Sequence, residues 1–193
     1  MYHKLLEYIV FPIGDLFNKS SYLKQLNYWR KVDYLSEKEL QSLQKKNLKR
    51  ILEHAVHNIA HYQHIKLVGK DPYAWLQQFP VLTKDILRKK NTDLIKPTSK
   101  NLIKYNSSGS SGKQSVVYMN SEEQSVIRGI LTLWWEWSGY KVGKPLVQTG
   151  MKLKRKWAKT FKDYFFNKLY INAFSLSESQ CKKYDQKLNF INK

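Results

Sequence analysis

The sequence has few of the features that would fix its class at once. Its single cysteine, Cys181, excludes any disulfide within the chain. The apolar run near the start, Tyr8 to Ile13, is too short to cross a bilayer and contains Pro12. No small-residue cleavage site follows this run, which argues against a secretory signal. We therefore expect a cytoplasmic protein.

Acidic residues are scarce relative to basic ones. The 193-residue chain has 15 Asp and Glu against 34 Lys and Arg, which gives a formal net charge of +19. Such an excess favours contact with phosphates, an anionic membrane face or an acidic substrate, although a lysine-rich proteome would produce the same balance. Hydrophobic residues make up 42% of the chain and aromatic residues 14%, which excludes a disordered class and allows one domain with a core.

Residues 1–97 are predicted to be a mainly helical region. Ser36 with Glu39 matches a capping box at the start of a long helix. The apolar positions of this helix recur at helical spacing and are Leu40, Leu43, Leu48, Ile51, Leu52, Ala55, Ile59 and Tyr62. Further along, Thr83 is expected to be the N-cap of a helix that runs to about Lys90.

Residues 98–193 are predicted to be a partial α/β nucleotide-binding region, which begins with a β-hairpin over residues 102–119. Ser121 with Gln124 then matches a second capping box, at the start of a helix that extends to about Ser138. The polar side of this helix is a narrow strip of Arg128, Thr132 and Glu136. Because the rest of its circumference is apolar, we expect it to be buried. Three tryptophans are then expected in the core, rather than in an aromatic pocket or stacked on bases: Trp134, Trp135 and Trp137.

Alternating strands and helices follow this buried helix. Strands over 146–149 and 169–172 flank a helix near 157–166, and Ser177 with Gln180 is expected to cap a last helix. Four strands are few for a sheet that must bury so apolar a helix. The predicted fold class is therefore α/β, with a helical N-terminal region, a β-hairpin loop and the start of a layered domain. We expect an incomplete fragment of a larger domain, with an exposed sheet edge.

The most informative segment is the tip of the hairpin, which is rich in small and hydroxyl side chains. It consists of Ser107, Ser108, Gly109, Ser110, Ser111, Gly112 and Lys113. A turn of this kind between two strands exposes backbone N–H groups and hydroxyls beside an ammonium, an arrangement suited to a polyphosphate. A flexible glycine-serine linker would have the same composition. A Walker A loop is excluded, because two residues rather than four separate Gly109 from Gly112.

Two further clusters have functional and plain interpretations. Four histidines would share one side of the long helix and could bind zinc or nickel: they are His54, His57, His61 and His64. No cysteine and no nearby carboxylate pair completes such a site, so we expect a solvated polar face. A basic strip beside Trp157 could follow a phosphate backbone or be a charged loop: it consists of Lys152, Lys154, Arg155, Lys156 and Lys159. We assign no metal ligand and no catalytic residue from the sequence.

The chain resembles a known family in these motifs. The loop from Ser107 to Lys113 resembles the phosphate-binding loop of adenylate-forming enzymes, the acyl- and aryl-CoA ligase superfamily. Residues 79–86 resemble the helical start of phenylacetate-CoA ligase-like proteins, as do Trp29, Leu40, Leu48, Ile51, Leu52, His54, Ala55, Asn58 and Tyr62. Residues 172–177 are similar to the CapK-type proteins of capsular polysaccharide clusters. The resemblance covers nearly the whole chain but only the N-terminal part of the family's domain.

This resemblance implies ATP-dependent activation of a carboxylate. The carboxylate would attack the α-phosphate, pyrophosphate would leave and an acyl-adenylate would form, normally with Mg²⁺. Carried over by position, Lys113 would add a point charge at the β- and γ-phosphates. The residues that would surround these phosphates are Ser107, Ser108, Gly109, Ser110, Ser111 and Gly112. Gln114 departs from the family pattern, which usually has proline there.

Several parts of the family's active site have no counterpart in this sequence. The adenine-binding loop, the ribose-binding aspartate and the lid lysine would lie beyond residue 193. We therefore expect the chain alone to be inactive, with ATP, a small carboxylate and a missing C-terminal half as partners. The alternative is a non-enzymatic basic binder of nucleic acid or an anionic membrane surface, and of these a peripheral membrane contact is the one compatible with the enzyme hypothesis.

Overall fold

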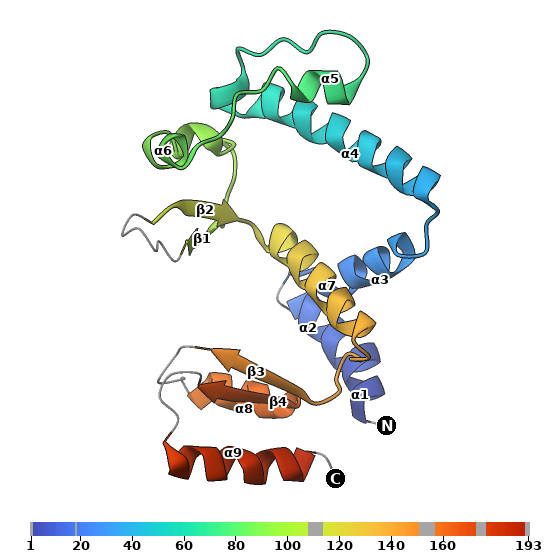
Figure 1. The fold of residues 1–193 in the computed structure, drawn as a ribbon, viewed down its shortest axis with the longest axis vertical. Helices are drawn as coiled ribbons and strands as arrows, with labels where there is room; N and C mark the ends of the chain where they lie inside the picture. The colour runs from blue at the N-terminus through green and yellow to red at the C-terminus, as the bar shows by residue number, and fades with distance from the viewer. Residues whose placement is uncertain (1, 18, 108–113, 151–156, 173–176, 192–193) are drawn as a thin grey trace. The chain divides into compact units, whose positions relative to one another are not determined.

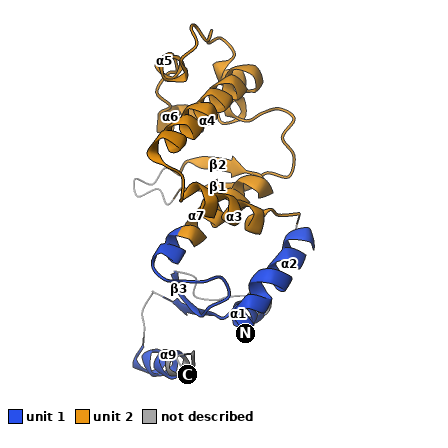
Figure 2. Cartoon of the chain, turned by 90° about the vertical axis from the view of Figure 1, so that its right-hand side faces the viewer, with its two compact units in different colours: residues 1–17, 134–193 blue, residues 18–133 orange. Residues whose placement is uncertain are grey.

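The chain forms two compact units, which Figure 2 distinguishes by colour. The computed structural model describes residues 2–17, 19–107, 114–150, 157–172 and 177–191. Unit 1 comprises residues 1–17 and 134–193, and unit 2 comprises residues 18–133. The β-hairpin thus belongs to the same compact unit as most of the helices before it. Mixed helices and small sheets after a helical N-terminal region confirm the predicted α/β class (Figure 1).

Unit 2 begins with helices, as the sequence predicts. They are α3 (Tyr22–Val32), α4 (Glu37–Asn58), η2 (Ala60–Tyr62), α5 (Pro72–Leu76), α6 (Lys84–Lys89) and η3 (Thr92–Leu94). The capping box at α4 is confirmed: Glu39 N donates to Ser36 Oγ at 3.4 Å, and Ser36 N donates to Glu39 Oε2 at 2.8 Å. α4 ends at Asn58, so the predicted apolar stripe is too long. Leu52 is buried, whereas Leu40 and Ile51 are exposed.

The hairpin of unit 2 consists of β1 (Ile103–Asn106) and β2 (Val116–Met119), which pair antiparallel. The helix that follows, α7 (Ser121–Trp137), begins one residue away from the predicted cap. Asn120 Oδ1 accepts a hydrogen bond from Glu123 N at 2.8 Å, and Glu123 Oε2 accepts one from Asn120 N at 2.7 Å. The prediction of a box between Ser121 and Gln124 is therefore wrong, because Asn120 and Glu123 form the box one residue earlier.

α7 packs against α3 through small residues, all of them in unit 2. Ser125 Oγ accepts a hydrogen bond from Ser21 N at 3.1 Å, and Thr132 Oγ1 lies 3.1 Å from the hydroxyl of Tyr22. A Cβ at Gly129 would lie 3.0 Å from Leu26 N, so the two backbones approach closely only because this residue is glycine. Thr132 is buried, which contradicts its predicted place on a polar strip.

Unit 1 combines short N-terminal helices with a βαβ element. Its elements besides the end of α7 are α1 (Tyr2–Leu5), η1 (Leu6–Val10), α2 (Phe11–Phe17), β3 (Leu146–Gly150), α8 (Trp157–Phe165), β4 (Lys168–Asn172) and α9 (Glu178–Ile191). β3 and β4 are parallel, with Val147 opposite Leu169, and α8 packs against β4 (Figure 1). The predicted strands and the predicted crossover helix are confirmed. The predicted cap of α9 is confirmed as well, by reciprocal hydrogen bonds between Ser177 and Gln180.

The core of unit 1 is small in the described residues. Leu6, Val142 and Leu169 are its buried apolar side chains. Gly143 has a φ of +82°, and a Cβ there would lie 2.8 Å from the carbonyl oxygen of His3, so the turn before β3 requires glycine.

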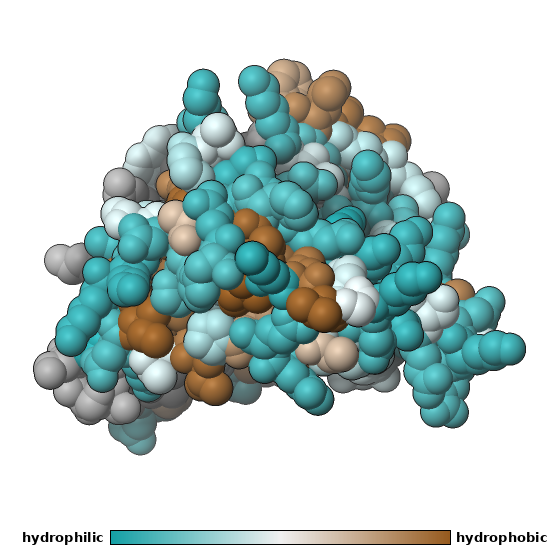
Figure 3. All heavy atoms as spheres, turned by 90° about the horizontal axis from the view of Figure 1, so that it is seen from above, coloured by the Kyte–Doolittle hydropathy of each residue, from teal (hydrophilic) through white to brown (hydrophobic). Residues whose placement is uncertain are grey.

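Many large apolar side chains of the described residues lie on the surface. Trp134, Trp135 and Trp137 are exposed in the structure, so the prediction that they are core residues is wrong for the described chain. Figure 3 shows apolar side chains, coloured brown, in several patches among hydrophilic ones on the face that it presents. None of the helices described combines the length and the apolar composition that crossing a bilayer requires.

Candidate phosphate-binding site

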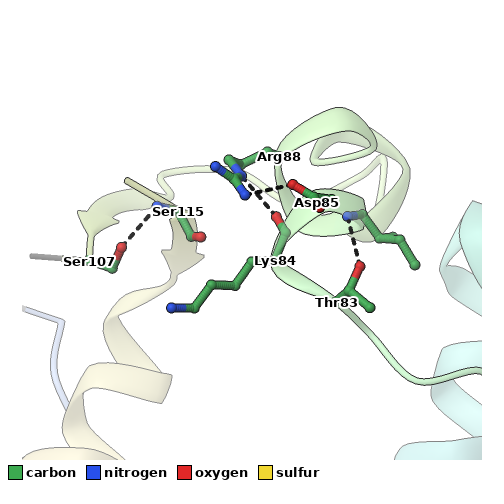
Figure 4. Close-up of polar contacts among 7 residues, drawn as sticks. Thr83, Lys84, Asp85, Arg88, Ser107 and Ser115 are labelled. Carbon is green, nitrogen blue, oxygen red and sulfur yellow. Dashed lines mark hydrogen bonds and ion pairs between the residues drawn. The ribbon is translucent and has the colours of Figure 1, made fainter. Parts of the chain in front are cut away.

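The hairpin ladder continues one residue pair beyond the strands, to the base of the serine-glycine tip. Ser107 N donates to the carbonyl oxygen of Ser115 at 2.9 Å, and Ser115 N donates to Ser107 Oγ at 2.9 Å. Figure 4 shows the second of these bonds between the two strands. Ser107 and Ser115 therefore hold the two ends of the intervening segment at the separation of a paired ladder.

Within the described part of the chain, Ser115, which directly precedes β2, is buried and has an unpaired hydroxyl. Its exposed fraction is 9%, and its Oγ has no hydrogen-bond partner among the described residues. A buried hydroxyl without a partner costs free energy, roughly 1–3 kcal/mol in mutational data. The hydroxyl is thus available at the base of the tip for a ligand or for the segment 108–113.

The base of the hairpin is tied to α6 and η3 within unit 2. Asn91, which follows α6, donates from Nδ2 to the carbonyl oxygen of Val116 at 2.8 Å. Thr83 caps α6 as predicted, because its Oγ1 accepts a hydrogen bond from Ile86 N at 3.3 Å. On the other side, Gln124 of α7 donates a hydrogen bond to the hydroxyl of Tyr105 in β1. Contacts on both strands thus fix the position of the hairpin stem.

Basic residues are frequent in the chain just before the hairpin. Lys84 begins α6, and Figure 4 shows its side chain extending towards the hairpin. In the described structure no acidic group lies within ion-pair distance of the Lys84 ammonium, whereas Arg88 pairs with Asp85 at 2.6 Å. Over residues 84–104 the basic residues are Lys84, Arg88, Lys89, Lys90, Lys96, Lys100 and Lys104, and the acidic residues are Asp85 and Asp93. The local charge therefore favours an anion at this end of the hairpin.

Of the predicted phosphate-binding residues, the described structure includes only Ser107. Ser108, Gly109, Ser110, Ser111, Gly112 and Lys113 lie outside the described residues. The sequence interpretation missed Ser115, Asn91 and Lys84. Ser115 has the same residue type as the tip and directly follows it, and Lys84 opens a lysine-rich stretch, so both carried a signal in the sequence. Asn91 carried none, because its role depends on a contact 25 residues away.

The histidine cluster does not form as predicted. His54 and His57 lie on α4, but this helix ends at Asn58, so His61 falls in η2 and His64 follows it. His57 Nδ1 lies 2.6 Å from the carbonyl oxygen of Glu53, and the ring of His61 contacts that of Tyr62. A search of the described residues finds no group of three or more His, Cys, Asp or Glu that could hold a metal.

The second sequence candidate is the basic strip near Trp157. Residues 152–156 lie outside the described residues, and Lys159 lies on α8. Trp157 itself is exposed.

The chain is similar to a known protein. The chain is 30% identical to Protein CapK from Staphylococcus aureus over 188 residues, which span 91% of this chain and 41% of CapK. No family model matches the chain. No solved structure matches it. The chain is therefore CapK-like at low identity, and it spans about two fifths of the length of that relative.

Proposed function

We propose that this chain is the phosphate-binding portion of an ATP-dependent, adenylate-forming ligase that acts in capsular or other cell-surface polysaccharide biosynthesis. The observation that carries the proposal is the Ser107–Ser115 pair, which closes an antiparallel hairpin around a tip of serines, glycines and Lys113. The similarity to CapK supports the assignment to this biological process. The excess of basic residues over positions 84–104 supports a polyphosphate as the ligand.

In this proposal the chain's own groups bind the triphosphate and neutralise charge. Backbone N–H groups and hydroxyls from Ser107 to Gly112 would bind the β- and γ-phosphates, and the ammonium of Lys113 would lie beside them. Within the described structure the Ser115 hydroxyl has no hydrogen-bond partner and the Lys84 ammonium has no ion-pair partner. The hydroxyl would add a hydrogen-bond donor to the site, and the ammonium would add a positive charge. These contacts would favour departure of pyrophosphate when a carboxylate attacks the α-phosphate.

Mg²⁺ would enter this site with the nucleotide. Magnesium is generally held by phosphate oxygens and water together with one or two carboxylates. The described residues around the hairpin base offer Asp85, which already pairs with Arg88. We therefore assign no metal ligand in this chain and no reaction step to the ion.

ATP binding by the full chain tests the proposal directly. We expect calorimetry to show binding of Mg·ATP that the combined change Ser108→Ala and Lys113→Ala weakens by about tenfold or more, since charge-assisted phosphate contacts contribute roughly 1.5–3 kcal/mol. The matched control is Ser42→Ala with Lys46→Ala, which removes the same groups from exposed positions on α4, outside the basic stretch of residues 84–104. Equal losses in the two double variants, or no ATP binding by the parent chain, would refute a specific phosphate loop.

Net charge supports a second candidate function. At +19, the chain could bind anionic surfaces without any catalysis. In that case retention on anionic vesicles or nucleic acid should fall steeply between low and physiological salt, and Lys113→Ala should weaken it no more than Lys100→Ala. A selective effect of Lys113→Ala on nucleotide binding would decide for the ligase proposal.

A further inference from the structure

The parallel strand pair of unit 1 is an incomplete sheet. β3 and β4 pair with each other, and within the described residues neither pairs with a third strand. Parallel strands normally occur in sheets with several members and with both faces covered. Val147 on β3 nevertheless remains 44% exposed, although Leu169, its partner in the register, is 8% exposed. The pair thus retains an open side at β3.

The crossover helix of the same βαβ element carries an uncovered aromatic surface. Trp157, Phe161 and Tyr164 are exposed by 83%, 67% and 76%, and their spacing of four and three residues places them on one face of α8. We call these three residues the α8 stripe. The stripe has no charged member, and tryptophan, tyrosine and phenylalanine are enriched at the centres of protein interfaces.

These two features indicate a polypeptide as the ligand. An open strand edge is completed by backbone N–H and C=O groups from another strand, which a lipid surface cannot supply. A second copy of this chain fits poorly, because two-fold symmetry would pair identical edges antiparallel and would end the parallel sheet. More than half of CapK has no counterpart in this chain, so a CapK-like fold includes a large polypeptide segment that could fill both positions.

We propose that the α8 stripe and the open parallel pair dock a second polypeptide, equivalent to the part of CapK that this chain does not match. The docked segment would add strands to the β3–β4 pair and would bury the α8 stripe. The proposal concerns assembly and requires no catalysis, so it can fail or succeed independently of nucleotide binding.

The test is co-expression of the full chain with a tagged polypeptide that comprises the unmatched part of S. aureus CapK. We expect capture of the chain on the tag, a one-to-one complex by light scattering, and slower hydrogen exchange in β3, β4 and α8. Phe161→Asp should reduce capture by about tenfold or more, as truncation of an interface hot spot does. Tyr34→Asp is the matched control, because Tyr34 is also exposed but lies in unit 2, and it should leave capture unchanged.

Solubility of the tagged polypeptide alone does not limit the test, because the two can also be joined in one chain. In the fusion we expect α8 amides to exchange more slowly than in the free chain, and Phe161→Asp to reverse that protection. Unchanged exchange in the fusion, or capture that Phe161→Asp leaves intact, would overturn the proposal. Stripe-dependent self-association, or stripe-dependent retention of the free chain on phosphatidylserine vesicles without any complex, would overturn it in favour of a second copy or a membrane.

Discussion

Apolar side chains are buried to different degrees in two regions of the molecule. These regions are the contact between α3 and α7 in unit 2 and the β3–α8–β4 element in unit 1. The first is closed: Gly129 allows the backbones to meet, and the hydroxyls of Ser125 and Thr132 have hydrogen-bond partners. The second is open, with one buried leucine in β4 and an exposed aromatic face on α8. At the first of these two places close packing depends on small residues, whereas at the second large aromatic side chains remain on the surface.

This difference has a consequence for folding. A contact made by small residues and backbone can form within the chain, because the buried hydroxyls of Ser125 and Thr132 have partners nearby. A parallel pair with an aromatic helix gains most of its stability only when both faces are covered. We therefore expect unit 2 to keep its structure in the isolated chain and unit 1 to depend more on its few buried residues.

The largest predicted effect on stability comes from truncating one of the few buried residues of unit 1. Leu169→Ala should lower the free energy of unfolding of unit 1 by about 2–5 kcal/mol, because it leaves a cavity where the side chain is 8% exposed. Val147→Ala, on the opposing strand in the same register, should cost roughly 1 kcal/mol or less because Val147 is already half exposed. Urea unfolding followed by hydrogen exchange of unit 1 peptides measures both. Equal losses would show that β3 is as well covered as β4 and would remove the contrast.

The sequence predicted the β3–α8–β4 element better than it predicted the α3–α7 contact. Residues 146–149 and 169–172 were recognisable as strands, and Ser36, Thr83 and the hairpin could be assigned, because caps and turns depend on neighbours in the chain. The buried face of α7 could not be assigned. Hydrophobicity pointed to the tryptophans, but the approach of α3 to Gly129 decided the outcome, and that contact depends on residues about a hundred positions away.

The same distinction applies to the candidate site. The composition of residues 107–113 predicted a phosphate loop, and the structure adds the pair that closes it, Ser107 with Ser115. The bond from Asn91 to Val116 depends on the register of the hairpin against the end of α6, which no local pattern encodes. Local chemistry therefore predicted the tip of the candidate site, whereas the contacts at its base follow only from tertiary structure.

The second prediction tests the closed contact. Gly129→Val should destabilise unit 2 by about 1–3 kcal/mol, because its Cβ would lie 3.0 Å from Leu26 N and 3.1 Å from Gln25 C, which are backbone atoms that cannot move aside cheaply. Gly14→Val is the control, since it makes the same change in helix α2, where a Cβ at Gly14 would have no neighbouring atom within 4 Å. Thermal unfolding with exchange in α3 and α7 measures the effect. If Gly129→Val is as harmless as Gly14→Val, the helices do not meet through this glycine.

A smaller effect separates the two possible caps of α7. Asn120→Ala should reduce the stability of the first turn of α7 by about 1 kcal/mol, because it removes the acceptor for Glu123 N. Ser121→Ala should cost less, since the Ser121 hydroxyl makes only a 3.4 Å hydrogen bond to Lys19 O. Exchange rates of the amides of residues 122–125 report on this turn. A larger loss in Ser121→Ala would restore the capping box that the sequence favoured.

The smallest effect is a pH dependence at the start of α4. The hydrogen bonds from Ser36 hold the pKa of the Glu39 carboxyl below its usual value, and the side-chain bond is the larger cause. Because the folded pKa is the lower one, the capping box stabilises the first turn fully above the usual glutamate pKa, and this contribution is lost as pH falls through the folded pKa. The protection factors of the amides of residues 37–40, which correct exchange rates for their intrinsic dependence on pH, should therefore fall on acidification. Ser36→Ala should return the pKa of Glu39 towards its ordinary value, which the NMR shift of the carboxyl carbon reports. The same change should flatten the dependence of protection on pH. Glu37→Gln is the control and should leave that dependence in place. A profile that survives in Ser36→Ala would mean that another group controls this turn.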